Sequence, residues 1–154
     1  MDKEFGGDVL IFDSEEGGEI SVVNGLVLMD RGFSSAVYLS LFGGNGKDLG
    51  DVASNNTWWG NKLEDSLESE KLVSRFVSFI SSEPLTSKNL ILAEDKIQED
   101  LKWFVDDGIA DLIEVEILDA GNNRIQVDIK IGKDGEMIES GRFGFQWEVM
   151  KNGI

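Results

Sequence analysis

Residues 113–117 read Ile-Glu-Val-Glu-Ile, and residues 125–131 read Ile-Gln-Val-Asp-Ile-Lys-Ile. Apolar and polar side chains alternate in both stretches, which predicts two strands with one face on a core and the other in water. A turn at Gly121-Asn122-Asn123 separates them, and a second turn at Asp134-Gly135 leads to alternating aromatic residues at 143–147. The sequence therefore predicts a C-terminal antiparallel β-meander.

Two helices are predicted before the meander. The first starts at Leu72 and ends at Pro84, and the second starts at an N-cap Thr86 or Ser87 and ends at Gly108. Each has apolar residues at intervals of three and four, as expected for one buried face. These residues are Leu72, Val73, Phe76, Val77 and Ile80 in the first helix, and Leu90, Ala93, Ile97, Leu101 and Phe104 in the second.

Short strands are predicted near the N-terminus. Residues 19–23 and 26–29 flank Asn24-Gly25, a dipeptide that suits a type I′ turn because both central positions need positive φ. A further short apolar run occupies residues 9–12. Residues 36–42 are almost wholly apolar, and their pattern fits either a buried strand or a short buried helix.

The order of these elements predicts an α+β fold: N-terminal short strands, a long Gly/Trp loop at 43–61, two helices, and the meander. The 154 residues are expected to form a single domain, in which residues 1–30 could form an acidic strand arm. This arm contains one lysine and eight acidic residues, a net charge of −7. The whole chain has 14 basic and 30 acidic residues and a net charge of −16.

Composition excludes several classes of function. With no Cys and no His, the chain has no thiol nucleophile, no Cys/His zinc site and no Ser-His-Asp triad. The strong negative charge argues against binding to nucleic acid, and the sequence contains neither an apolar run that would span a membrane nor the basic start of a signal peptide. We expect a soluble protein made and kept in a reducing cytoplasm, without a cofactor or a bound metal.

Two motifs resemble chemical sites but fit ordinary structure better. Gly43-Gly44-Asn45-Gly46-Lys47 is glycine-rich, yet a phosphate loop needs Gly where Leu41 stands and Ser or Thr where Asp48 stands, so a flexible loop is the better interpretation. Glu114 and Glu116 share one face of a strand about 7 Å apart. Such a pair could in principle hydrolyse a glycosidic bond, but it is also what a solvated strand face looks like.

The Trp58-Trp59 pair is the least ordinary feature of the sequence. Neighbouring residues of an extended chain face opposite sides, so one indole could fill the core while the other awaits a partner; alternatively, both close the core. The N-terminal strands could likewise pair within the chain or add to the edge of a partner's sheet. The candidate partner-binding residues are Trp58, Trp59, Gly60, Asn61, Val22, Leu26 and Leu28.

Three blocks carry a family resemblance. Residues 35–42 read Ser-Ala-Val-Tyr-Leu-Ser-Leu-Phe, residues 58–61 read Trp-Trp-Gly-Asn, and residues 143–147 read Phe-Gly-Phe-Gln-Trp. With the helix and meander between them, they resemble the Mu-type phage tail baseplate protein family over residues 18–148. The chain has Asn56-Thr57 where that family tends to have Arg-Gly, and Asn61 where it tends to have Asp.

The resemblance implies a non-enzymatic structural component of a contractile-tail baseplate in a phage or prophage, related to wedge, sheath-initiator and lysozyme-like baseplate proteins. The implied partners are other baseplate and sheath proteins, and the implied location is the tail baseplate of the virion, after synthesis in the bacterial cytoplasm. Self-association into a homo-oligomer is left open.

Two other interpretations remain. One is a muralytic glycosidase that acts through paired carboxylates, and the other is a small acidic adaptor that binds a basic host protein. The enzyme would need a concave site and a carboxyl group whose pKa is raised by burial, whereas an assembly protein would not.

Overall fold

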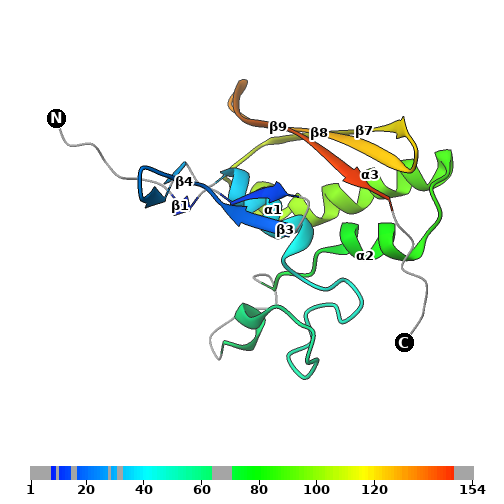
Figure 1. The fold of residues 1–154 in the computed structure, drawn as a ribbon, viewed down its shortest axis with the longest axis horizontal. Coiled ribbons are helices and arrows are strands. Elements are labelled where there is room, and N and C mark those ends of the chain that lie inside the picture. Colours follow the sequence, from blue (N-terminus) through cyan, green and yellow to red (C-terminus); the bar gives the residue numbers. More distant parts are fainter. Residues whose placement is uncertain are drawn as a thin grey trace. The chain divides into compact units, whose positions relative to one another are not determined.

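The computed structural model describes residues 8–9, 11–14, 17–27, 29–30, 33–63 and 71–147. The chain divides into two compact units, Met1–Leu39 and Ser40–Ile154. The fold is of the α+β class, as predicted, with short N-terminal strands, helices and a C-terminal three-stranded sheet (Figure 1).

Among its described residues, the first unit contains three two-stranded antiparallel pairs. β1 (Asp8–Val9) pairs with β6 (Met29–Asp30), β2 (Ile11–Ser14) with β3 (Gly17–Ile20), and β4 (Val22–Val23) with β5 (Leu26–Val27). The turn between β4 and β5 has φ of 52° at Asn24 and 76° at Gly25. The predicted Asn-Gly hairpin is therefore confirmed.

The apolar run at 36–42 is helical. It lies within α1 (Phe33–Phe42), and the boundary between the two units falls inside this helix. Val37 and Leu41 are buried and four residues apart, which is the spacing of one helix face. Of the two alternatives that the sequence leaves open for this run, the structure selects the helix.

The second unit is built on the predicted meander. β7 (Leu112–Gly121), β8 (Arg124–Lys133) and β9 (Glu136–Gln146) form an antiparallel sheet in the order β7-β8-β9. Cross-strand partners include Ile117 with Val127 and Ile125 with Phe145, so the apolar sets share one face. The backbone N–H of Ile117 donates to Glu94 Oε1 at 2.9 Å, which satisfies one donor on the outer edge of β7.

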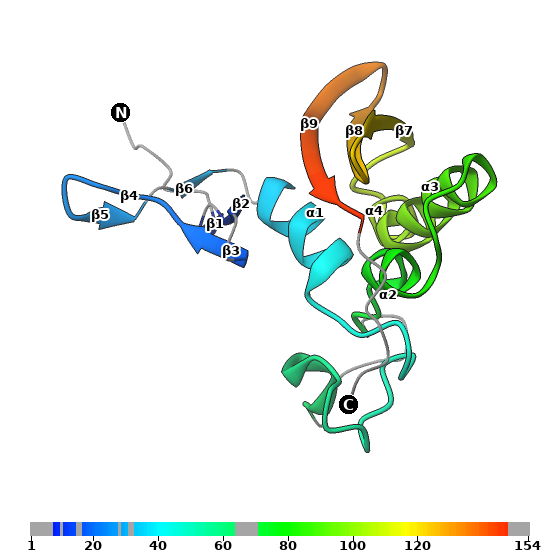
Figure 2. The same cartoon turned by 45° about the vertical axis from the view of Figure 1, so that its right-hand side comes forward.

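Helices cover the apolar face of the sheet. α2 (Arg75–Ser82) packs on α3 (Ser87–Leu101), α3 contacts β7, and a short α4 (Trp103–Asp106) follows (Figure 2). Thr86 caps α3 by accepting from the N–H of Asn89, as predicted. Gly108 ends the helical region with φ of 72°.

The helix boundaries differ from the prediction in two places. The first helix begins at Arg75 and not at Leu72, because Ser74 takes a left-handed conformation with φ of 51°. The second helix is interrupted at Lys102, between α3 and α4. None of the helices in the described part of the chain is long and apolar enough to span a bilayer.

The core of the second unit lies between α2, α3 and the sheet. Phe42, Phe76 and Phe145 form an aromatic cluster with ring centroids 4.9 to 6.0 Å apart. Trp147 is buried, and its indole N–H donates to Glu83 O at the end of α2. The other buried apolar side chains of this core come from both layers: Ile80, Ala93, Ile97, Leu101, Phe104, Ile117, Ile125, Val127, Ile129 and Ile131.

Candidate functional site

The Gly/Trp loop presents one of its two tryptophans to solvent. Trp59 is 68% exposed, whereas Trp58 is half-buried, and their ring centroids are 5.2 Å apart. The interpretation in which both indoles close the core is therefore wrong for Trp59. Partner binding by Trp59 remains a prediction.

Gly60 allows the Trp58 ring to lie directly against the backbone. A Cβ atom at position 60 would fall 2.6 Å from Trp58 Cε3 and closer still to Cζ3 and Cη2. Such contacts are tighter than van der Waals packing allows. Gly60 lies in the short 3₁₀ helix η1 (Trp59–Lys62). Because of these close contacts, any side chain added at position 60 must displace the indole.

We expect Gly60→Ala to lower the free energy of unfolding by about 1–2 kcal/mol, because the Trp58 indole must leave its place. Denaturant unfolding measures this. Gly144→Ala is the matched control, since a Cβ there meets nothing within 4 Å, and it should leave stability within about 0.5 kcal/mol of the wild type. Equal losses in the two variants would contradict the proposed role of Gly60.

Asn61 fixes the position of this loop. Its side chain is 1% exposed, and its amide donates to Thr57 Oγ1 at 3.1 Å and to Leu72 O at 2.9 Å. The amide oxygen accepts from the Leu72 N–H at 2.8 Å. Asn61 therefore joins the tryptophan loop to the segment just before α2, and its side-chain amide forms its hydrogen bonds within the chain.

The glycines at 44 and 46 also serve packing. A Cβ at Gly44 would lie 2.7 Å from Leu72 O, and one at Gly46 would lie 3.0 Å from Arg75 Cα. The Gly44 N–H donates to Ser74 Oγ at 2.7 Å, and the Gly46 N–H donates to Ser78 Oγ at 3.0 Å. The sequence suggested a flexible loop, but the structure gives a different reason for the glycines, which is close backbone approach to the start of α2.

Asp100 of α3 caps α2 from outside. Its Oδ1 accepts from the Arg75 N–H at 2.8 Å, and its Oδ2 accepts from the Phe76 N–H at 2.9 Å. Ser74, the residue before α2, makes no side-chain cap; its hydroxyl donates to Ser40 O at 2.8 Å. The carboxylate therefore satisfies two of the N–H groups that the first turn of α2 leaves without intrahelical partners.

Burial raises the pKa of the Asp100 carboxyl to about 6, against the opposing effects of its two backbone hydrogen bonds and of Arg75. A polar pocket with a volume of about 360 Å³ adjoins it and is also lined by Ser40, Leu49, Lys71 and Trp103. The two features expected of an enzyme thus meet here. However, the Asp100 side chain is 1% exposed and both its oxygens accept backbone N–H groups, so the arrangement is that of a helix cap.

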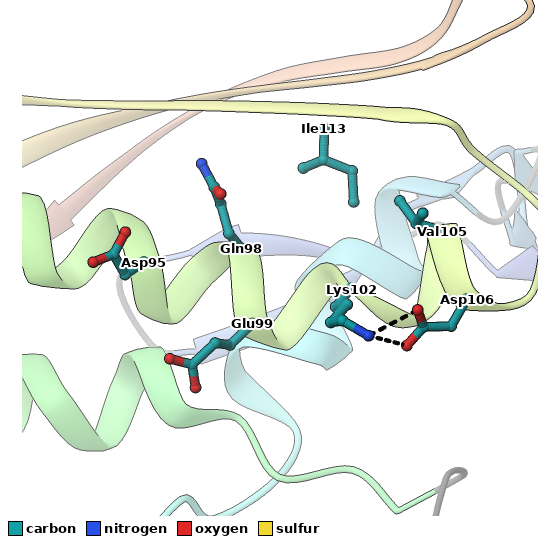
Figure 3. Close-up of a pocket in the computed structure, with 7 residues that line it drawn as sticks. All are labelled: Asp95, Gln98, Glu99, Lys102, Val105, Asp106 and Ile113. Atoms are coloured by element: carbon teal, nitrogen blue, oxygen red, sulfur yellow. Dashed lines mark hydrogen bonds and ion pairs between the residues drawn. The ribbon is translucent and has the colours of Figure 1, made fainter.

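A second, open groove with a volume of about 520 Å³ runs along α3 and α4 to the start of β7 (Figure 3). Val105 and Ile113 form its apolar end. Lys102 Nζ donates to both oxygens of Asp106, at 2.7 and 2.8 Å, and Glu99 pairs with Lys96 and Arg75. Of its three lining carboxylates, Glu99 and Asp106 are therefore already engaged in ion pairs within the chain, and Asp95 is exposed.

The carboxylate pair considered from sequence lies on the solvent face of the sheet. Glu114 and Glu116 are both exposed on β7, and their cross-strand partners are Lys130 and Asp128. Arg142 of β9 donates to both oxygens of Asp128, at 2.7 and 3.0 Å, and this lowers the pKa of Asp128. The two glutamates are thus part of a charged outer sheet face, as the simpler interpretation predicted.

The N-terminal candidates lie on the β4–β5 hairpin of the first unit. Val22 is 59% exposed and Leu26 is 72% exposed, so both are accessible to a partner. Leu28 lies outside the described residues. The exposure of Val22 and Leu26 agrees with a contact role.

Sequence reasoning missed the polar residues that organise the second unit. The hydroxyls of Ser74 and Ser78 accept the N–H groups of the glycine loop and so bring it to α2. Ser40 O accepts from the Ser74 hydroxyl, and Asp100 caps α2. Ser40 Oγ also accepts from the indole N–H of Trp103 at 2.9 Å. A lone serine, or one carboxylate among 30, gives no sequence signal that distinguishes it from a surface residue.

In comparison with known families, residues 33–137 match the family described as phage protein GP46. Neither the curated proteins nor the solved structures contain a match to the chain. The matched region includes the tryptophan loop, α2 to α4 and the first two strands of the sheet, and it begins after the N-terminal hairpin. Because it spans more than half of the 154 residues, the chain belongs to the phage protein GP46 family.

Proposed function

We propose that this protein is a non-enzymatic structural component of a phage or prophage contractile-tail baseplate. It would be made in the cytoplasm of the bacterial host and assemble there with neighbouring baseplate and sheath proteins, with initiation of the sheath as one role. Membership of a phage protein family supports the part of the proposal that assigns the chain to a phage or prophage. The resemblance of the blocks at 35–42 and 58–61 to Mu-type baseplate proteins supports the part that assigns it to the baseplate.

The observation that carries the proposal is the exposed indole of Trp59 on a loop that is fixed in place. Large aromatic side chains dominate the energetics of many protein interfaces. A residue held before binding loses little conformational entropy when the partner arrives. Here Asn61 and Gly60 hold the backbone around Trp59, and the loop lies within the part of the chain that matches the family.

Trp59→Ala should separate assembly from folding. Because the indole is largely in solvent, we expect the free energy of unfolding to change by less than about 1 kcal/mol. Loss of an interface anchor costs about 2 kcal/mol or more, so incorporation into tails should fall by about tenfold or more. The measurement is the amount of tagged protein, by quantitative mass spectrometry, in tails purified from a phage-producing host.

Ile91→Ala is the matched control, because Ile91 is an exposed apolar residue on α3. It should enter tails like the wild type. Wild-type protein absent from purified tails would overturn the baseplate proposal. Normal incorporation of Trp59→Ala would leave the baseplate role standing but remove Trp59 as its anchor.

The glycosidase alternative has one observation in its favour, the raised pKa of Asp100 beside a pocket. Its geometry opposes this role, because a general acid must reach the leaving-group oxygen and Asp100 is covered. Purified protein should therefore fail to clear a peptidoglycan suspension. Clearing that is lost in Glu114→Gln or Asp100→Asn, with the variants still folded, would favour the enzyme.

A further inference from the structure

The β4–β5 hairpin exposes apolar side chains on both of its faces. Val22 pairs with Val27 and Val23 pairs with Leu26, and successive residues of a strand point to opposite faces. One face therefore carries the first pair and the other face carries the second. All four side chains are between 44% and 72% exposed.

This pattern differs from that of an ordinary surface hairpin. An antiparallel pair that packs on its own core is apolar on one face and polar on the other. Here neither face is the polar one, and residues 20–27 contain no charged side chain. Exposed apolar side chains gathered on one hairpin are typical of an interaction site.

The hairpin is poorly suited to extend a partner's sheet. β4 and β5 have two residues each, so an edge offers few N–H and C=O groups to a neighbouring strand. Binding energy must therefore come mainly from the side chains. Burial of both faces requires a partner that contacts the hairpin from two sides.

The negative charge around the hairpin indicates which charged side chains surround the binding surface of the partner. Residues 1–30 contain eight acidic residues and one lysine, and Glu19 and Asp30 bracket the uncharged residues 20–29. A second copy of this chain would bring an equal negative charge and be repelled. A rim of lysine and arginine would be attracted and would guide the hairpin into place.

We propose that the β4–β5 hairpin inserts with both faces into an apolar cleft of a partner protein, and that lysine and arginine side chains line the rim of this cleft. The inference deepens the proposed function, since it names the chemistry of a partner in the assembly. It concerns a segment that precedes the matched residues 33–137.

Site-specific photocrosslinking in a phage-producing host tests the insertion. A photoreactive benzoylphenylalanine is placed at position 22 in one version of the full chain and at position 23 in another, so that each probes one face. Both should crosslink to the same subunit, at apolar residues that have lysine or arginine nearby. A probe at Lys88, which is exposed at the start of α3, is the control and should not give this product.

Side-chain truncation provides a second measurement on the crosslinked subunit once it is identified and purified. Val27→Ser changes one face and Leu26→Ser changes the other, and each should weaken binding by about tenfold or more. Because attraction between opposite charges is screened by salt, binding of the unchanged chain should also weaken at high ionic strength. A loss confined to one of the two variants would show contact with a single face.

Crosslinks from one position only, from neither, or to another copy of this chain would overturn the insertion. The identity of the partner decides the proposed function separately. Crosslinks from both faces to a protein that is not part of the tail would leave the insertion standing and overturn the baseplate role. Purified tails that contain the protein but show neither crosslink would overturn the insertion and leave the baseplate role standing.

Discussion

Asp100→Ala is expected to lower the free energy of unfolding by about 2 kcal/mol near neutral pH, because it leaves two N–H groups at the start of α2 without a partner. Denaturant unfolding of the full chain measures this. The loss should be accompanied by faster amide exchange at Arg75 and Phe76. Asp95→Ala on the same helix is the control; Asp95 is exposed and its replacement should matter little.

The effect of Asp100 should also depend on pH in a defined direction. Burial raises the pKa of this carboxyl from 3.8 to about 6 in the folded protein, so the folded state binds the proton more tightly than the unfolded state. The resulting stabilisation is fully present below pH 3.8 and is lost as the pH rises through about 6. Stability from this group therefore increases on acidification, the reverse of a salt-bridged aspartate.

Between about pH 7 and about pH 5, the wild type should gain about 1 kcal/mol relative to Asp100→Ala. This range stays above the isoelectric point of 4.2, where the protein would lose its net charge. Subtracting the free energy of unfolding of Asp100→Ala from that of the wild type at each pH removes the contribution of the other carboxylates. A difference that stays constant with pH would contradict the raised pKa, as would a titration midpoint near 4 for the Asp100 carboxyl carbon by NMR.

Asn61→Ala is expected to lower the free energy of unfolding by about 3 kcal/mol. The substitution removes three hydrogen bonds and leaves the backbone N–H and C=O of Leu72 without the partner that Asn61 supplies. Asn61→Asp should be no better, because a carboxylate keeps the bond from the Leu72 N–H but cannot donate to Leu72 O or Thr57. Thermal and denaturant unfolding measure both variants.

Asn55→Ala is the control for Asn61, since Asn55 is an exposed asparagine of the same loop and should tolerate replacement within about 0.5 kcal/mol. If Asn61 positions Trp59, hydrogen exchange in residues 48–63 should also rise under native conditions. Unchanged stability together with unchanged exchange would show that the loop is held by other contacts.

The sequence alone determined the C-terminal meander, the turn at Asn24-Gly25 and the capped start of α3. Each depends on a local signal: the two-residue alternation of strands, a dipeptide that accepts positive φ, or a threonine at an N-cap. The family resemblance also came from sequence, and the match to a phage family confirms that the chain is a phage protein. These features persist because tertiary packing agrees with the local preference.

The tertiary structure decided what local signals leave open. Residues 36–42 have no periodicity that separates strand from helix, and their burial at helical spacing settled the matter. Asp100 and Asn61 act on partners 24 and 11 residues away in the chain, at Phe76 and Leu72. A hydrogen bond of this kind depends on how helices and loops pack against one another. Neither the residue type nor its spacing in the sequence predicts that packing. The exposure of Trp59 beside half-buried Trp58 was decided in the same way, by which indole finds backbone to pack against.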